Sequence, residues 1–221
     1  MWGRAALYLV YLVAGTAAMV AWYLFFRRYN RRQGEQVLAW IAATLDGSGE
    51  VMAVSWLGPS LLRVALRLDT SLFQRPALTV RLVPRQMPLE WLRHWWRGEP
   101  ATITWQADLD IPPSFNLQAG QHRWCGRSRK RLVPDRARWT FEPVTPLILT
   151  SRRSWPREVT AMMSTLLSCR EREVLSLGFR STSPHFSAVI PLACISPEGR
   201  AGGNIYETLR ELAAGASASR R

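Results

Sequence analysis

The feature that most constrains this chain is an apolar run near its N-terminus that ends at a cluster of arginines. From Ala5 to Phe26 there is no charged residue, and Arg27 follows directly. A helix rises about 1.5 Å per residue, so a run of this length spans the roughly 30 Å hydrocarbon core of a bilayer. A helix also satisfies its own backbone hydrogen bonds inside lipid. The run therefore predicts a transmembrane helix over residues 5–26.

The charges on either side of this run predict its orientation. Only Arg4 and the amino terminus precede it, whereas a basic juxtamembrane segment, residues 27–34, follows it. Because positively charged loops stay in the cytoplasm, we expect residues 1–4 outside and the rest of the chain at the cytoplasmic face of the plasma (inner) membrane. Trp and Tyr near the end of the run suit a membrane–water interface. The predicted membrane-interface residues are Trp22, Tyr23, Arg27, Arg28, Arg31 and Arg32.

The small residues at positions 14–18 allow two other interpretations of the same run. They are of the kind that signal peptidase accepts, which would make the run a cleaved signal peptide. The apolar run continues beyond them to Phe26, however, and this length favours an uncleaved anchor. Ala14 and Ala18 also form a small-xxx-small pair, which allows a second membrane helix to approach closely.

The composition beyond the anchor is that of a folded and strongly basic protein. The chain has 29 Lys and Arg against 16 Asp and Glu, with 48% hydrophobic residues, so it is not a disordered tail. Among the cations only Lys130 is a lysine. Arginine suits phosphate and carboxylate recognition. A GC-rich genome is the alternative explanation, because it encodes arginine in place of lysine throughout. Close to a membrane, each arginine contributes on the order of 1 kcal/mol of attraction to anionic lipid headgroups.

Residues 35–111 are predicted to form a first α+β unit. Apolar residues recur at helical spacing over its first part, and strict alternation later indicates a strand with one buried face. In that strand Arg63 and Arg67 belong to the exposed face. The expected elements are a helix over 35–45, strands over 51–57, 61–68, 77–83 and 103–109, and a short helix over 88–96 that begins with proline.

The remainder divides into a connecting region, a second unit and a tail. Residues 112–156 are rich in arginine and proline, and we expect a strand or two there, around 138–141 and 147–150, within loops. Residues 157–213 form the second unit, and residues 214–221 should be a flexible tail. The second unit is expected to contain a helix over 158–167, strands over 173–179 and 187–193, and a final helix over 206–213.

A helix followed by a β-hairpin is thus predicted twice. The pairs Glu50-Val51 and Glu173-Val174 fall at equivalent positions of the two units. These identities are few, so they indicate a shared architecture more than a gene duplication. The predicted fold class is α+β, with one N-terminal transmembrane helix followed by a cytoplasmic domain of two α-β-β units, a possible pseudo-repeat.

The sequence presents no pattern of catalytic, metal-binding or cofactor-binding residues. His94, His122 and His185 are far apart and lack metal-binding spacings such as H-E-x-x-H. The three cysteines form no C-x-x-C pair. The glycine-rich residues 199–203 match no phosphate-binding loop motif. We therefore expect no cofactor, no metal and no enzymatic activity.

The short helix over 88–96 is a candidate binding surface. Tryptophan combined with arginine on one helix suits a lipid headgroup boundary or a groove on a partner protein. The alternative is a helix that packs onto the sheet, with its tryptophans in the core. The predicted lipid- or partner-binding residues are Trp91, Arg93, Trp95, Trp96 and Arg97.

The segment 123–138 is a second candidate surface because basic residues are concentrated in it. Basic side chains near Trp124 and Trp139 could follow a nucleic-acid backbone and stack on bases. They could equally face anionic lipid, an acidic partner or solvent. The basic patch consists of Arg123, Arg127, Arg129, Lys130, Arg131, Arg136 and Arg138.

Together these features predict a single-pass, non-enzymatic interaction protein at the inner leaflet, an accessory or scaffold subunit of a larger membrane complex. Its expected partners are other membrane protein subunits and anionic lipid headgroups. The alternative is a membrane-tethered nucleic-acid-binding protein that uses segment 123–138. An enzyme acting on lipid-linked substrates finds no supporting motif in the sequence.

Overall fold

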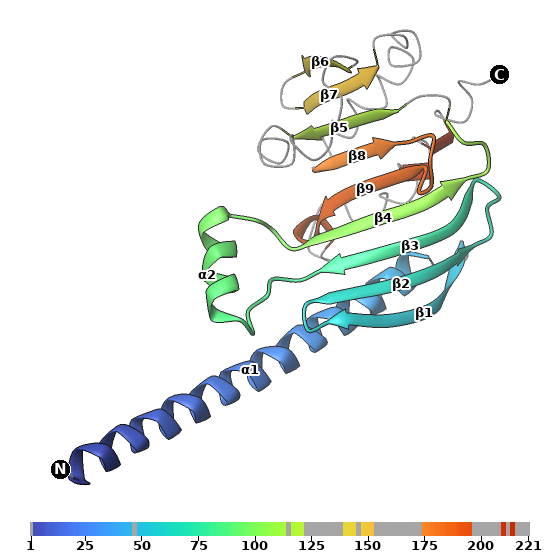
Figure 1. Ribbon diagram of the computed structural model, residues 1–221. Helices are drawn as coiled ribbons and strands as arrows, with labels where there is room; N and C mark the ends of the chain where they lie inside the picture. The colour runs from blue at the N-terminus through green and yellow to red at the C-terminus, as the bar shows by residue number, and fades with distance from the viewer. Residues whose placement is uncertain are drawn as a thin grey trace.

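A single long helix, α1 (Trp2–Thr44), runs from the predicted membrane span to the β-sheet of the protein (Figure 1). The computed structural model describes residues 2–45, 48–113, 116–121, 139–144, 147–152, 174–195, 209–210 and 213–214. Within these residues, α1 is one helix that is long and apolar enough to cross a membrane. Its 43 residues measure roughly 65 Å at the standard rise. This length exceeds a bilayer core, so the helix also reaches into the sheet domain.

The helices predicted over 5–26 and 35–45 are therefore two parts of one helix. The basic segment 27–34 continues the helical backbone between them. It contains no proline, and four of its eight residues are arginine, which is among the better helix formers. The sequence predicted two separate helices because the apolar pattern ends at the arginines. This change in pattern marks the predicted boundary between membrane and water, and the helix continues across it.

In the described part of the chain, nine strands form one sheet in which every neighbouring pair is antiparallel. The strand order across the sheet is β1-β2-β3-β4-β9-β8-β5-β7-β6. The strands are β1 (Gly49–Gly58), β2 (Leu61–Leu68), β3 (Phe73–Arg81), β4 (Thr102–Leu109), β5 (Leu117–Gln121), β6 (Trp139–Val144), β7 (Leu147–Arg152), β8 (Ser176–Phe179) and β9 (Phe186–Pro191). This sheet and α1 give a mixed α+β fold, as predicted.

Strand β2 confirms the prediction made from alternating residues. Its bounds are those predicted, Leu62 and Val64 are fully buried, and Arg63 between them is exposed. Strands β6 and β7 also agree with the two strands expected in the connecting region. Alternation identified β2 because one of its faces packs on the core and the other faces solvent.

Strand β3 begins earlier than predicted, at Phe73 rather than at residue 77. Arg75 has a positive φ of 49°, and the pairing register with β4 shifts between Gln74 and Ala77. Such a bulge leaves one residue unpaired, which accommodates Pro76 because proline cannot donate a ladder hydrogen bond. The sequence-based boundary placed the strand after this proline, where the chain in fact bends and continues.

The structure does not confirm the predicted two-unit repeat. The helix expected over 158–167 lies outside the described residues, so one element of the second unit cannot be compared. The two hairpins occupy different places, because β1 and β2 lie at one edge of the sheet and β8 and β9 lie in its middle. Pairing of β4 with β9 joins the two halves of the chain in one continuous sheet.

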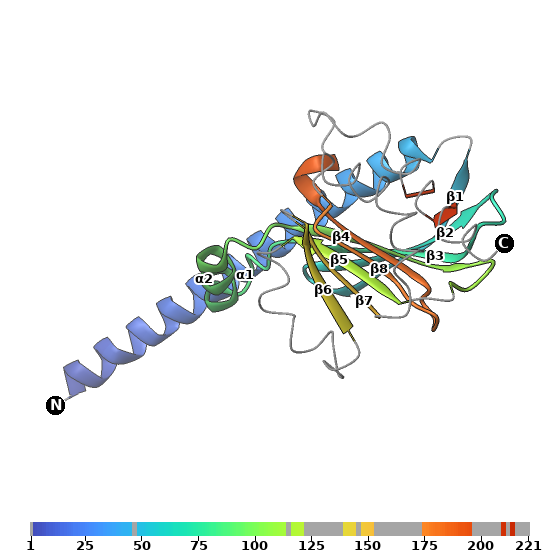
Figure 2. The same ribbon diagram turned by 90° about the horizontal axis from the view of Figure 1, so that it is seen from above.

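The C-terminal part of α1 lies across one face of the sheet (Figure 2). Ile41 and Leu45 of α1 are buried in the same apolar cluster as Val64 of β2, Val80 of β3 and Phe186 of β9. Burial of a large apolar side chain contributes about 1.5–3 kcal/mol relative to exposure. Packing of this kind, rather than helix propensity alone, holds the end of α1 against the sheet.

A second helix, α2 (Pro88–Arg97), connects β3 to β4. It lies at the end of the sheet from which α1 extends toward its N-terminus (Figure 1). The chain thus places α2, the loop before it and the β1–β2 turn around the same stretch of α1.

Gly34 marks the closest approach of α1 to the sheet. It is buried, and a Cβ atom added to it would lie 2.5 Å from Cη2 and 2.8 Å from Cζ2 of Trp56 on β1. Real Cβ atoms do not approach other atoms this closely, so the indole ring occupies the space that any side chain at this position needs. The glycine, unfavourable in a helix by about 1 kcal/mol relative to alanine, is therefore required by packing.

We expect Gly34→Ala to lower the thermal unfolding midpoint of the sheet domain. Overpacking typically costs about 1–3 kcal/mol, which equals or exceeds the gain of about 1 kcal/mol in helix propensity. The matched control is Gly15→Ala, because no atom lies within 4 Å of the corresponding Cβ position. Circular dichroism of both variants in detergent measures the difference, and a Gly34→Ala protein as stable as the control contradicts this account of Trp56.

Candidate membrane-interface site

The helix α2 and the loop before it are held against α1 at the end of the apolar run. The Trp22 indole Nε1–H donates a hydrogen bond to the Arg85 carbonyl oxygen at 3.0 Å. The rings of Trp22 and Trp91 pack edge to face, with centroids 6.5 Å apart. The Arg85 guanidinium lies over the Tyr29 ring, 4.8 Å from its centroid. These contacts place α2 beside the predicted membrane boundary.

A buried chain of amide hydrogen bonds fixes the same loop more firmly. Asn30, on α1, is 2% exposed, and its Nδ2 donates to the Val83 carbonyl at 3.2 Å and to Gln86 Oε1 at 2.8 Å. Gln86 Nε2 lies 3.4 Å from Ser60 Oγ in the β1–β2 turn. Buried polar groups are costly unless they are paired, so these side chains must keep this arrangement.

Neither Asn30 nor Gln86 was identified as a site residue from the sequence. The available signal was an asparagine inside a helical segment of arginines, where asparagine is unfavourable unless its amide has a partner. The partner comes from a loop more than fifty residues later in the chain, so local sequence could not reveal it.

Helix α2 has well-defined ends. Pro88 occupies its first turn, and Gly98 follows it in the left-handed conformation with a φ of 58°. The Gly98 N–H bonds to the carbonyl oxygens of His94 and Trp95. Proline at the start and glycine just past the end are the favoured residues for these positions.

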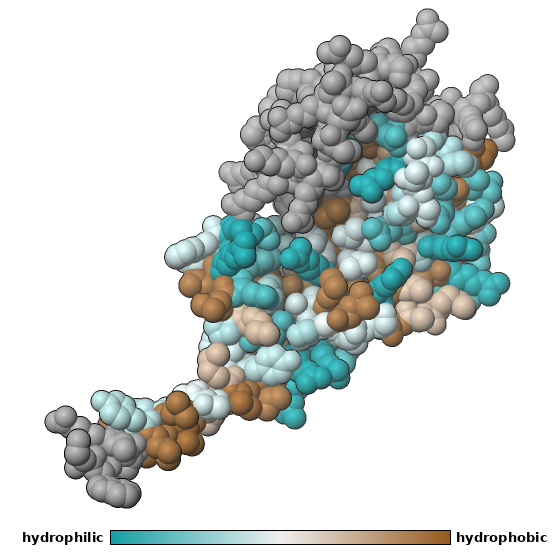
Figure 3. All heavy atoms as spheres, in the orientation of Figure 1, coloured by the Kyte–Doolittle hydropathy of each residue, from teal (hydrophilic) through white to brown (hydrophobic). Residues whose placement is uncertain are grey.

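The apolar residues of α2 face away from the sheet. Within this helix only His94 is buried, whereas Leu89 is 83% exposed and Trp96 is 77% exposed. Figure 3 shows hydrophobic side chains along the described part of the apolar run of α1 and a smaller group at α2, beside hydrophilic ones. We call this set the apolar face of α2; its residues are Leu89, Trp91, Leu92, Trp95 and Trp96. The interpretation of the tryptophans as core residues is therefore wrong.

The buried side of α2 is polar but uncharged at neutral pH. Burial lowers the pKa of the His94 imidazole below its ordinary value of 6.5; the nearby Glu99 carboxylate opposes this shift and Arg81 adds to it. His94 Nδ1 lies 3.5 Å from Glu99 Oε2. Arg97, predicted to bind a lipid or a partner, lies 3.7 Å from the same carboxylate group. Arg93 is exposed and free to face an anionic surface.

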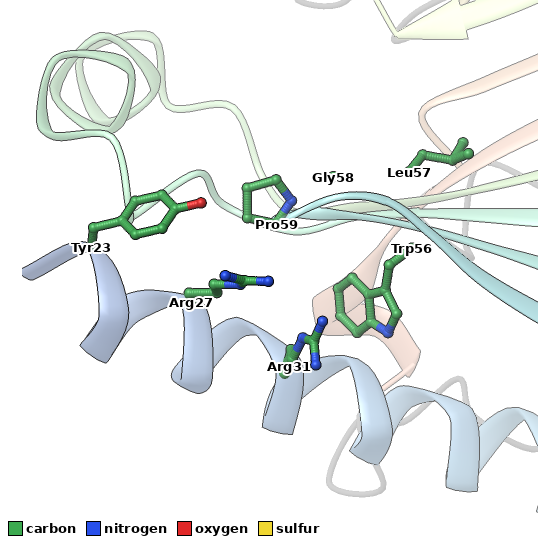
Figure 4. Close-up of a pocket in the computed structure, with 7 residues that line it drawn as sticks. All are labelled: Tyr23, Arg27, Arg31, Trp56, Leu57, Gly58 and Pro59. Carbon is green, nitrogen blue, oxygen red and sulfur yellow. The ribbon is translucent and has the colours of Figure 1, made fainter. Parts of the chain in front are cut away.

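A cleft lies between α1 and the β1–β2 turn. It has a volume of about 240 Å³ and is lined by Tyr23, Arg27, Arg31, Trp56, Leu57, Gly58 and Pro59. Figure 4 shows Arg27 and Arg31 projecting from α1 toward the turn, with the Trp56 ring beside Arg31. We call it the arginine cleft. Arg28 and Arg32, which were predicted together with these residues, are exposed and do not line it.

Among the described residues, the two arginines of the cleft make no ion pair. No carboxylate lies within 4.0 Å of Arg27 or Arg31 among the residues that the structure describes. Tyr23, Arg27 and Arg31 follow one another at intervals of four residues and so share one face of the helix. A phenol and two guanidinium groups therefore line one wall of a single cleft.

The other predicted site residues contribute no described binding geometry. The basic patch Arg123, Arg127, Arg129, Lys130, Arg131, Arg136 and Arg138 lies outside the described residues. His185 is held within the fold, where its Nδ1 accepts a hydrogen bond from the Leu109 N–H at 3.2 Å. Among the described residues no group of His, Cys, Asp and Glu side chains is placed to hold a metal ion.

No family model matches this chain, and no curated protein matches it either. Its function must therefore be inferred from the chemistry of the two surfaces, the apolar face of α2 and the arginine cleft. Both surround α1 at the level where its apolar run ends, and both depend on the amide hydrogen bonds of Asn30 and Gln86.

We expect Asn30→Leu to destabilise the attachment of α2. The variant leaves the Gln86 amide and the Val83 carbonyl without their buried partner, which costs about 1–3 kcal/mol. Hydrogen exchange of residues 83–97 should therefore accelerate, and the thermal midpoint should fall. Gln36→Leu is the control, because Gln36 is an exposed amide on the same helix. Equal behaviour of the two variants would show that the amide chain does not hold the loop.

Proposed function

We propose that this chain is a single-pass membrane-anchored protein without enzymatic activity, which holds its sheet domain on the bilayer surface. In this role it serves as an accessory or scaffold subunit of a larger membrane complex. The observation that carries the proposal is the exposed apolar face of α2, attached through Trp22 beside the end of the apolar run. Such a face is unfavourable in water and favourable at the headgroup boundary of a membrane.

The proposed location is the cytoplasmic face of the inner membrane. Arg27, Arg28, Arg31 and Arg32 follow the apolar run, whereas Arg4 is the one arginine before it. Positive residues are retained on the cytoplasmic side and are attracted there by anionic lipid. Continuity of α1 supports an uncleaved anchor, because the helix does not end at the small residues 14–18 but continues through the rest of the apolar run to Thr44.

Two further surfaces support a role in a larger assembly. Around Gly15 of α1 no atom lies within 4 Å of the position of an added Cβ, and the flanking small residues are exposed, so a second membrane helix can approach closely. Strand β1 forms one edge of the sheet, and no described strand pairs with its outer side. Met52 and Val54 on β1 are exposed, and an edge of this kind accepts a strand from another chain.

We expect the triple variant Leu89→Gln, Trp95→Gln and Trp96→Gln to release α2 from the membrane. Each apolar side chain removed from the interface weakens this contact by about 1.5–3 kcal/mol. For protein in lipid nanodiscs, hydrogen exchange of residues 88–97 should become fast in the variant. Glu90→Gln is the control, because Glu90 is an exposed residue of the same helix that does not belong to its apolar face. Fast exchange of this segment in the wild-type protein would argue against contact with lipid.

The assembly role is tested by purifying the tagged full-length chain from its native membrane in a mild detergent. A defined set of membrane proteins should co-purify and should persist at high salt, because apolar helix and strand contacts are not screened. Nucleic-acid contacts through segment 123–138 weaken steeply with salt. A chain that purifies alone, or only with salt-labile nucleic acid, contradicts the proposed subunit role.

A further inference from the structure

We infer that the arginine cleft is a binding site for the phosphate of an anionic glycerophospholipid. The inference rests on the proposed membrane anchoring and deepens it, because it assigns one lipid class to one site. Diffuse attraction of a basic segment to a membrane requires no cleft and treats its arginines alike. The structure instead separates Arg27 and Arg31, which line the cleft, from Arg28 and Arg32, which do not.

The polar wall of the cleft has the chemistry of a phosphate site. Arg27 and Arg31 project from adjacent turns of α1 toward the same space (Figure 4). Guanidinium groups bind phosphate oxygens through paired hydrogen bonds, and these bonds are shorter and stronger because both partners are charged. Neither group has a carboxylate within 4.0 Å in the described structure, so the two positive charges repel each other, and a bound anion reduces that repulsion.

The remaining walls favour a lipid over a soluble phosphate. Trp56 and Pro59 give the cleft apolar surface, and Tyr23 belongs to the last turns of the apolar run. A ligand that satisfies all of these groups has an anionic head next to hydrocarbon, which is the structure of a phospholipid at the membrane boundary.

The position of the cleft makes the lipid part of the domain's attachment. Gly34, against which the Trp56 ring packs, lies within one turn of Arg31, so the wall of the cleft is also the contact between α1 and β1. Ser60 in the adjoining turn is linked through Gln86 to Asn30. A lipid phosphate bound here therefore bridges the anchor helix and the first hairpin of the sheet.

Native mass spectrometry of the full-length protein in detergent tests this inference. Phosphatidylglycerol and phosphatidylcholine are titrated separately into the wild-type chain, the Arg27→Gln/Arg31→Gln variant and the Arg28→Gln/Arg32→Gln variant. Both variants lose the same charge from exposed positions of the same helix segment. We expect the wild type and the second variant to retain one phosphatidylglycerol, and the cleft variant to bind it at least about tenfold more weakly, equivalent to about 1.4 kcal/mol. Equal weakening in the two variants overturns the inference.

A soluble competitor distinguishes a lipid from a free phosphate. Inorganic phosphate at equal concentration should not displace bound phosphatidylglycerol from the wild-type chain, because it lacks the acyl chains that contact the apolar surface beside the arginines. Complete displacement by inorganic phosphate overturns the assignment to a lipid.

Fractionation of the same variants separates this inference from the proposed function. All of them should remain in the membrane fraction after a high-salt wash, because α1 is unchanged over its apolar run. A wild-type chain that leaves the membrane contradicts the anchoring on which the inference rests. A wild-type chain that stays in the membrane but shows no preference for phosphatidylglycerol overturns only the lipid site.

Discussion

The arrangement of this protein around its long helix depends on the buried amide pair of Asn30 and Gln86. Unpaired amides in this position would cost about 1–3 kcal/mol, so the pair fixes how α1 is rotated relative to the loop before α2. Once that rotation is set, helical geometry decides the rest. Trp22, two turns before Asn30, faces α2, and Arg27 faces the β1–β2 turn. One hydrogen-bonded contact thus positions both candidate membrane surfaces.

Helix α2 shows a reversed distribution of polarity. A surface helix of a soluble domain normally turns its apolar residues inward, but α2 buries His94 and exposes a row of leucines and tryptophans. No residue of α2 belongs to the buried apolar cluster that α1 and the strands share. Burial lowers the pKa of His94 below its ordinary value, which favours the neutral imidazole on the buried side. The exposed apolar face of α2 is unfavourable in water, which agrees with the proposed contact with lipid.

Local sequence patterns predict many of the individual helices and strands, but they do not predict how these elements are arranged. Alternation predicted β2 with its correct bounds, and proline predicted the start of α2, because these signals lie in adjacent residues. The strand order, in which β9 lies beside β4, depends on contacts between segments distant in the sequence, and local sequence patterns do not reveal such contacts. Tryptophan spacing in α2 showed that the rings share a face but not which way that face points. The arginines of 27–34 were recognised as a group, whereas their division by the cleft required the position of Trp56.

The continuity of α1 restricts how the sheet domain can move relative to the apolar run. A domain joined to its anchor by a flexible linker can tilt and rotate freely, whereas this domain shares one helix with the anchor and packs on its end. If the apolar run spans the membrane as proposed, a change in its depth or tilt would be transmitted to the sheet. A single helix still allows rotation about its own axis. The two proposed contacts away from that axis, α2 with lipid and a lipid phosphate with the arginine cleft, would oppose this rotation. The edge strand β1 would then be presented to a partner at a fixed height and angle above the bilayer.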